Sequence, residues 1–430
     1  MFQTIIKNTL AQGVGKFFVI LLSIATTALL TRLLGGVEGY GRYAFLTAFV
    51  LLFGTLSDWG TTPIAVREAS RTNIGRPVIF GSVTIFRLFF SVAALLLLNL
   101  VVRLNPNWHE FVYPATVASL VLVVLSLKTS SAIVFQTLLK MENTAVTEIV
   151  SSVALLGLVF LGFIFNGGIA WLMTAWVLAT LIASLVSWFL VIRLTHIVWA
   201  VDWSVARSVV WEALPAGLLL VVSSIYNRID TIILQHFQGA ADVGIYALAY
   251  KVHDNLVMGS AFLMNAVLPF LSKKFVQKSS WGELRALYQK TFDLLLGFGV
   301  FIFIFIFILS PLIIGVLGGP GFDRSAGVLR ILLLSTFFAY FNHLTGYSLL
   351  AFGRQRVSLV IAVSALVFNV AANWIFIPVY SYNAAAVITI ATEGFVLVLS
   401  SIVVWRTIGI FPSLFSITHT WTELLQIWKR

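Results

Sequence analysis

The sequence "GGVEGYGRYAF", residues 35–45, lies between two long apolar runs, and "QGAADVGIYAL", residues 238–248, lies between two more. Both stretches contain Gly-x4-Gly-x-Tyr-Ala, at an offset of 203 residues. Two further pairs of similar segments follow in the same order: residues 138–147 with 349–358, and residues 166–170 with 383–387. Their offsets of 211 and 217 drift slowly, as short insertions would make them. The pattern predicts that one structural unit occurs twice in the chain.

Composition places the chain in a membrane. The 430 residues are 60% hydrophobic and only 10% charged, with a mean hydropathy of +1.01, far from the composition of soluble domains. Apolar runs of about 20 residues are long enough to cross a hydrocarbon core of about 30 Å as helices. A helix also satisfies its own backbone hydrogen bonds there, so we expect helices throughout.

The predicted fold is an all-α polytopic membrane protein, with about 12 transmembrane helices in two parallel-repeat six-helix bundles. Because six is an even number, both halves enter the membrane from the same side, which makes the repeat parallel. The predicted helices are Gln12–Leu34, Tyr43–Ile64, Ile79–Val102, Phe111–Gln136, Val146–Phe165, Gly168–Ile192, Ala213–Phe237, Val243–Leu271, Phe292–Leu317, Ala326–Ala351, Val357–Pro378 and Ala384–Trp405.

The halves define four predicted segments. Residues 1–193 and 213–408 are the two six-helix bundles, and residues 194–212 between them form an interfacial linker helix with Trp199 and Trp203 on one face. Residues 409–430 repeat this amphipathic pattern as a tail. Both amphipathic segments are predicted to lie on the cytoplasmic membrane surface.

The charge distribution sets the orientation and excludes several functions. The net charge of +11 comes mainly from Lys and Arg in loops on one side, and such residues are retained in the cytoplasm. We therefore expect a multi-pass protein of the plasma (inner) membrane, with both termini cytoplasmic and no nucleic-acid partner. The chain has no cysteine, no HExxH and no phosphate-binding glycine loop, so we expect neither an enzyme nor a metal or cofactor site.

Three stretches resemble the polysaccharide-transporter, or Wzx-type, flippases of the multidrug/oligosaccharidyl-lipid/polysaccharide exporter superfamily. They are "ATTALLTRLLGGVEGYGRYAF" at 26–46, "DWGTTPIAVRE" at 58–68, and residues 212–252. The resemblance implies that an undecaprenyl-pyrophosphate type of lipid-linked oligosaccharide moves from the inner to the outer leaflet by alternating access. It also implies a cavity lined chiefly by the first, second, seventh and eighth helices. Membrane lipids and polysaccharide-assembly proteins are the other partners that it suggests.

Ionisable groups inside apolar helices are costly, so they mark candidate sites. Arg228 and Lys251 fall at similar depths in the seventh and eighth helices and are predicted to contact the substrate headgroup. The remaining predicted cavity residues are Arg87, Asn227 and Gln235.

Four carboxylates complete the candidate site as charge partners or as groups that couple transport to an ion: Asp58, Asp230, Asp254 and Glu393. One alternative is that the charges form purely structural pairs, such as Arg228 or Lys251 with one of the aspartates. Another is a proton- or sodium-coupled multidrug exporter of the same superfamily, which would rely on the carboxylates. A membrane glycosyltransferase or polymerase fits less well, because the loops are short.

Overall fold

The computed structural model describes residues 2–71, 76–199, 202–277 and 281–416, and these are helical apart from short connections. They divide into two compact units. The first unit comprises Met1–Gly244 with Leu317–Gly319, and the second comprises Ile245–Val316 with Pro320–Arg430. The predicted tail helix at 409–430 falls outside the described residues beyond Ser416.

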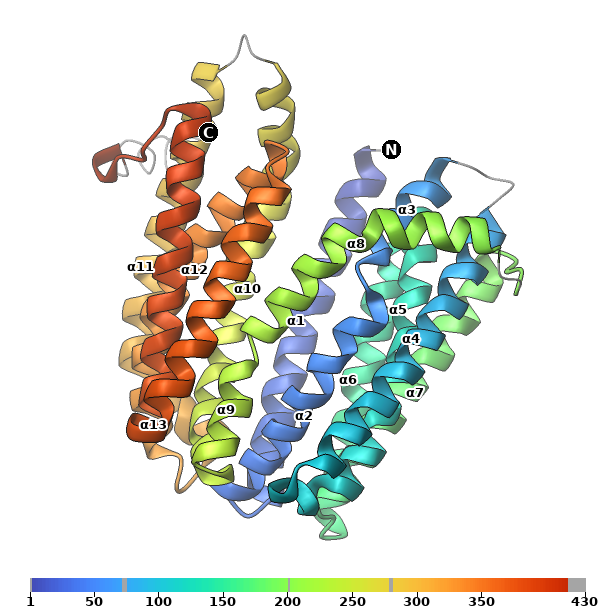
Figure 1. The fold of residues 1–430 in the computed structure, drawn as a ribbon, viewed down its shortest axis with the longest axis vertical. Helices are drawn as coiled ribbons and strands as arrows, with labels where there is room; N and C mark the ends of the chain where they lie inside the picture. Colours follow the sequence, from blue (N-terminus) through green and yellow to red (C-terminus); the bar gives the residue numbers. More distant parts are fainter. Residues whose placement is uncertain (1, 72–75, 200–201, 278–280, 417–430) are drawn as a thin grey trace. The chain divides into compact units, whose positions relative to one another are not determined.

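In the first unit, α5 lies at the centre and contacts α2, α3, α4, α6 and α7 (Figure 1). The core of this unit is aromatic at one end, where Phe45 packs against Phe49, Trp108 and Phe111 at ring-centroid distances of 5.0–5.8 Å. The helices of this unit are α1 (Phe2–Leu33), α2 (Val37–Asp58), α3 (Thr61–Arg71), α4 (Arg76–Leu104), the 3-10 helix η1 (Pro106–Phe111), α5 (Val112–Thr137), α6 (Met141–Ile164), α7 (Ile169–Leu194), α8 (Trp203–Tyr226) and α9 (Ile229–Phe237).

The second unit contains most of α10 (Ala240–Val276) and α11 (Trp281–Gly318), and all of α12 (Asp323–Ala351), α13 (Gln355–Ile408) and the 3-10 turn η3 (Leu414–Ser416). The start of α10, up to Gly244, and the end of α11, from Leu317, belong to the first unit. The 54-residue α13 reverses at Ser381, which has φ 52°, so that it forms two antiparallel legs (Figure 1). Eleven helices are long and apolar enough to span a membrane, and α13 supplies two passes. The described residues therefore form the twelve membrane passes that the sequence predicts.

Two predicted helices are broken. The second predicted helix, Tyr43–Ile64, divides into α2 and α3 because Trp59 and Gly60 both adopt left-handed backbone angles, with φ of 47° and 66°. The seventh, Ala213–Phe237, divides at Asn227 and Arg228 into α8 and α9. Polar runs such as "DWGTT" and "YNRIDT" supply side chains that bond the local backbone, which competes with the helix.

The connection between the halves is only partly helical. Residues 195–199 are not helical, and Val198 N donates to Pro77 O of α4 at 3.4 Å. Helix α8 begins at Trp203 and continues directly into the seventh membrane helix, with Pro215 inside it. In Figure 1 the start of α8 lies across the first unit before the chain turns down towards α9. The linker boundaries at 194 and 212 stay a prediction.

Matching turns confirm the repeat. Leu139 and Gly353 both have positive φ, 55° and 70°. Each lies at the end of a helix that closes with the same three backbone hydrogen bonds. In the first half these join 138 N to 134 O, 139 N to 136 O and 140 N to 135 O, and in the second half they join 352 N to 348 O, 353 N to 350 O and 354 N to 349 O. Asn166 and Ser381 match likewise, with φ of 53° and 52°. The structural offsets are 214 and 215, so the sequence comparison at 211 and 217 is shifted by two to three residues.

The twice-used glycine loop has a steric reason. A Cβ atom at Gly41 would lie 1.7 Å from the carbonyl oxygen of Ala240, and one at Gly244 would lie 2.0 Å from that of Val37. The two contacts are reciprocal, because Val37 and Ala240 are also 203 residues apart. Only glycine permits this approach of the starts of α2 and α10. The tyrosine of the second motif, Tyr246, is fully buried.

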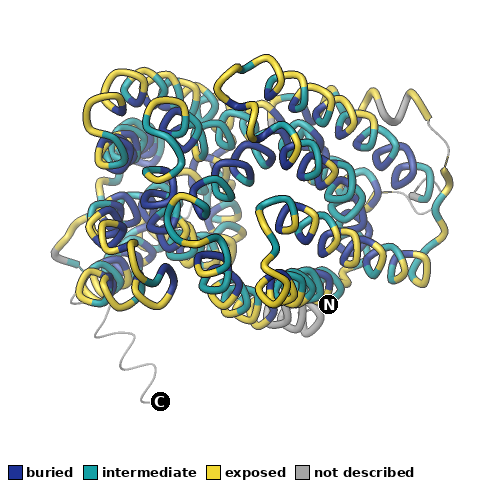
Figure 2. Tube along the Cα trace, turned by 90° about the horizontal axis from the view of Figure 1, so that it is seen from below, coloured by how far each residue is buried: buried dark blue, intermediate teal, exposed yellow. Residues whose placement is uncertain are grey.

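The apolar surface of each unit is consistent with lipid contact. Buried residues face neighbouring helices, and exposed residues cover the outward sides (Figure 2). Large apolar side chains such as Phe89, Phe165, Ile192 and Ile308 are 67–72% exposed. A soluble protein seldom exposes so much apolar surface, whereas a hydrocarbon environment favours it.

Candidate functional site

The break between α2 and α3 builds a polar site in the first unit. Asp58 is the last residue of α2, and Thr61 begins α3 only three residues later. The left-handed Trp59 between them donates its N–H to Thr55 O at 3.2 Å and stacks on Phe90 of α4. The turn therefore directs one carboxylate and the hydroxyls of the next helical turn towards α4.

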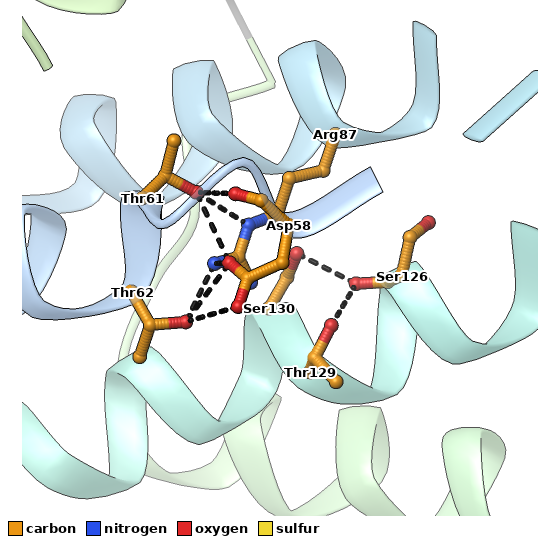
Figure 3. A network of polar contacts seen from close by, with 7 residues as sticks. All are labelled: Asp58, Thr61, Thr62, Arg87, Ser126, Thr129 and Ser130. Carbon is orange, nitrogen blue, oxygen red and sulfur yellow. Dashed lines mark hydrogen bonds and ion pairs between the residues drawn. The ribbon is translucent and has the colours of Figure 1, made fainter. Parts of the chain in front are cut away.

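Arg87 of α4 reaches into this turn (Figure 3). Its Nη2 forms an ion pair with the carboxylate of Asp58 and donates to Thr62 Oγ1 at 2.7 Å. Its Nε donates to Thr61 Oγ1 at 2.9 Å. The threonine hydroxyls in turn donate to Asp58, from Thr61 to the backbone oxygen at 2.7 Å and from Thr62 to Oδ1 at 3.2 Å. Three segments thus meet in one connected network.

The two charges of this pair differ in their surroundings. The Arg87 side chain is 0% exposed, whereas that of Asp58 is 34% exposed. A buried guanidinium without a counter-charge is strongly destabilising, so the carboxylate is what permits Arg87 to lie here. Arg87 Nη1 is buried and has no hydrogen-bond partner among the described residues. One donor of the cation is therefore left for another acceptor.

A band of hydroxyls on α5 adjoins the pair. Figure 3 shows Ser126, Thr129 and Ser130 beside the Asp58–Arg87 network, and α5 packs against both α2 and α4. Ser126 Oγ donates to Ser91 Oγ of α4 at 3.3 Å, and Ser130 Oγ donates to Ser126 O at 2.8 Å. Hydroxyls both donate and accept, so this surface suits a polar group or water inside the membrane.

The second break, between α8 and α9, carries four of the predicted site residues. Arg228 stands at the break with φ −137°, and Asn227 beside it is exposed. Asp230 is buried and accepts a 2.6 Å hydrogen bond from Thr231 N. Gln235 is half-buried, and its Oε1 has no partner in the described residues. A continuous helix would have placed these groups on one regular face, and the break redirects them.

In the second unit, Lys251 and Asp254 are exposed on α10, and Glu393 lies in the second leg of α13. Asn342 of α12 donates through Nδ2 to both Glu393 Oε2, at 2.5 Å, and Glu393 O, at 2.9 Å. A neighbouring polar chain runs from Asn373 to Asn369 to Thr392, at 2.9 and 3.2 Å. Glu393 is thus part of a hydrogen-bonded layer between α12 and α13.

The structure pairs Asp58 with Arg87, a partner that was not weighed from the sequence. Lys128 pairs with Glu148 of α6 at 2.9 Å. Sequence reasoning missed Thr61, Thr62 and Asn342 as partners of these charges. The stretch "DWGTT" offered a signal, since a glycine and two threonines lie within four residues of the membrane carboxylate Asp58.

Metal ligands are not gathered in the described residues, where no three His, Asp or Glu side chains form a group that could hold an ion. Two histidines of the membrane helices, one on α10 and one on α12, bond hydroxyls instead. His253 Nδ1 lies 2.8 Å from Thr336 Oγ1, and His343 Nδ1 lies 3.1 Å from Ser260 Oγ. Both histidines therefore take part in hydrogen bonds between α10 and α12.

The fold, with twelve membrane passes in repeated halves, is that of MOP-superfamily transporters. The chain is similar to an inward-facing multidrug resistance MATE family transporter, with a TM-score of 0.76 at 14% identity, covering 90% of this chain and 95% of that one. It is equally similar to the lipid II flippase MurJ in an inward closed conformation, with a TM-score of 0.76 at 16% identity over 97% and 92%. It is also similar to a MOP superfamily transporter from Pyrococcus furiosus, with a TM-score of 0.68 at 14% identity, covering 94% of this chain and 96% of that one.

The sequence narrows this class to a family. The family described as "Polysaccharide biosynthesis protein" matches residues 5–275, more than half of the chain, and the chain belongs to it. The MatE family matches residues 215–375. No curated protein matches the sequence significantly. The resemblance to polysaccharide transporters of the MOP superfamily is therefore confirmed.

Proposed function

We propose that this protein moves an undecaprenyl-pyrophosphate type of lipid-linked oligosaccharide from the inner to the outer leaflet by alternating access of its two six-helix halves. The observation that carries the proposal is the match to the polysaccharide biosynthesis family over residues 5–275. The likeness to a lipid II flippase supports it, because that protein acts on a lipid-linked substrate. Family relatives are transporters, which favours transport over catalysis.

The charged residues supply the chemistry that such a substrate needs. A pyrophosphate that enters a membrane loses its water and needs cations to replace it. Arg228 and Lys251 are the proposed headgroup contacts, and Asn227, Gln235 and Arg87 are the proposed polar lining. Arg87 has a buried donor to spare, which supports its inclusion.

The carboxylates Asp58, Asp230, Asp254 and Glu393 are proposed to balance these cations or to couple transport to an ion. We place the protein in the plasma (inner) membrane with both termini cytoplasmic, where it would meet polysaccharide-assembly proteins.

A proton- or sodium-coupled multidrug exporter is the second candidate. The observations that favour it are the MatE match over residues 215–375 and the likeness to a multidrug transporter. An exporter of cationic drugs would depend on Asp58 and Asp254, and neutralising them should abolish all transport. A flippase with the same substitutions should lose only its coupling to an ion gradient when transport is expressed per folded molecule, which is necessary because neutralising Asp58 also destabilises the protein.

The deciding experiment measures leaflet exchange of a fluorescent undecaprenyl-pyrophosphate oligosaccharide in liposomes that contain the purified protein. Arg228→Ala and Lys251→Ala should each slow flipping about tenfold or more, since each removes a charge-assisted hydrogen bond to the headgroup. Arg324→Ala, which removes an exposed cation in the first turn of α12, is the matched control and should flip normally.

Two results would count against the proposal. Normal flipping by both variants would remove Arg228 and Lys251 from the headgroup site. No flipping by the unaltered protein with several glycans, together with uptake of a cationic dye, would establish the exporter instead.

A further inference from the structure

A cavity of about 430 Å³ lies entirely within the second unit, between α11, α12 and the second leg of α13. Its walls are apolar, with Phe292, Phe337, Phe341 and Leu397 among them. This volume is within the range of about 300–1,000 Å³ that is usual for small-molecule sites. None of the charged residues discussed above lines it, so the proposed transport mechanism does not use it.

Residues 409–414, which we call the C-terminal strap, form one wall of this cavity. The strap is fastened by its backbone: Arg285 Nε donates to Ile408 O at 2.8 Å, and Gln289 exchanges hydrogen bonds with Ser413 at 2.8 and 2.9 Å. Its apolar side chains stay uncovered, since Phe411 is 75% exposed and Leu414 is 61% exposed. The cavity therefore opens beside an apolar surface that is free to contact lipid.

In the first unit, the segment after α7 corresponds in the repeat to the C-terminal strap, and it packs closely on its neighbouring helix. There the segment that follows α7 approaches α4 so closely that a Cβ atom at Gly81 would lie 1.8 Å from Val198 O. Trp188 and Trp199 pack against each other at 5.2 Å in the same region. The segment that follows the last helix of each half is thus placed differently in the two units: against α4 in the first, and along the cavity wall in the second.

The lining faces end in cations. On α11, Tyr288, Phe292 and Leu296 line the cavity at four-residue spacing, and Arg285 continues that face one turn earlier. On α13, Val398 and Ile402 line it, and Arg406 continues the face one turn later.

Both arginines are exposed. The nearby carboxylate, Asp293, is buried and already accepts hydrogen bonds from Gln289 and Ser416. An apolar body with two exposed cations at one end is complementary to an anionic amphiphile.

From this complementarity we infer that the cavity binds one acyl chain of an anionic phospholipid, whose headgroup meets Arg285 and Arg406. Both arginines belong to the end of the unit that the charge pattern places in the cytoplasm, so the ligand is an inner-leaflet lipid.

A resident phospholipid fits better than the transported lipid chain. The α11 lining from Tyr288 to Leu296 spans about 12 Å, less than half of a hydrocarbon core of about 30 Å. The strap also closes one side, which suits a bound lipid and not a moving one.

The test needs no transport assay, so it stands or falls separately from the proposed function. Native mass spectrometry of the purified full-length protein would compare phosphatidylglycerol with phosphatidylcholine of identical acyl chains. Each arginine near an anionic headgroup contributes about a fivefold preference, so phosphatidylglycerol should bind about 25-fold more tightly. Arg406→Gln should reduce that preference about fivefold, while Arg354→Gln, an exposed cation at the start of α13, should leave it unchanged.

A second pair of variants tests the apolar part. Val398→Trp, at a lining position that is 59% exposed, should lower binding of both lipids about tenfold by filling the cavity. Phe305→Trp, on the exposed side of α11, is the matched control. Equal affinity for the two lipids, or unchanged binding in Val398→Trp, would overturn the inference. Displacement of phosphatidylglycerol by an equal concentration of undecaprenyl phosphate would overturn it too, and would assign the cavity to the substrate chain.

Discussion

Removing the charge of Asp58 should destabilise the protein much more than removing the charge of its partner Arg87. In Asp58→Asn the guanidinium of Arg87, which is 0% exposed, loses its counter-charge where water cannot replace it. Breaking a buried pair in this way costs about 3–5 kcal/mol. In Arg87→Met the remaining carboxylate of Asp58 is 34% exposed and keeps the hydrogen bond from the Thr62 hydroxyl. Arg87→Met should therefore lower the free energy of unfolding by only about 1–2 kcal/mol.

The double variant supplies the sharper test. Asp58→Asn with Arg87→Met contains no buried charge, so it should be more stable than Asp58→Asn alone, although it carries one substitution more. The assay is the apparent melting temperature of the detergent-purified protein, followed by tryptophan fluorescence. Glu38→Gln is the control, because its pair with Arg42 is exposed at 64% and 42% and should contribute less than about 1 kcal/mol. If Arg87→Met proved the more damaging single change, the argument from exposure would be refuted.

Four substitutions that remove or introduce glycine extend the test to the backbone; the melting assay measures all of them except Gly217→Ala, for which folded yield and transport are measured. Gly41→Ala places a Cβ atom against a backbone carbonyl of α10 and should lower the free energy of unfolding by about 1–3 kcal/mol. The control, Gly157→Ala, meets open space and should be neutral or stabilising. Equal effects of the two substitutions would contradict the close contact at Gly41. Gly217→Ala should lower folded yield, because its Cβ would lie 2.6 Å from the carbonyl at the α2–α3 break; normal folding with slowed transport would instead indicate a hinge. Leu139→Gly should stabilise by about 1 kcal/mol, since this left-handed position is occupied by Gly353 in the other half, and a lower melting temperature would argue against strain there.

Hydropathy and the recurrent Gly-x4-Gly-x-Tyr-Ala were enough to predict the helices and the repeat. Both depend on local composition, because a membrane helix must carry about 20 apolar residues wherever it crosses. The break at Trp59 was not predictable in the same way. An aromatic residue in a left-handed conformation follows from the stacking on Phe90 and the contact with Gly217, which are tertiary.

The candidate site shows the same limit. Intramembrane charge identified Asp58, Arg87 and Glu393 as residues of interest, since each is costly in an apolar helix. Their partners lie far along the chain: Asp58 is 29 residues from Arg87, and Glu393 is 51 residues from Asn342. A sequence indicates which groups need a partner, whereas the packing of helices decides which partner each one finds.

The reciprocal contact of Gly41 and Gly244 has the geometry of an isologous dimer interface, in which residue i touches residue j of a copy and the copy returns the contact. In a true homodimer every substitution appears on both sides at once. Here the two sides are encoded separately, so one can change while the other is kept. Val37 and Tyr40 already differ from their counterparts Ala240 and Val243. A fused chain can therefore retain a symmetric contact and still change the residues on its two sides independently.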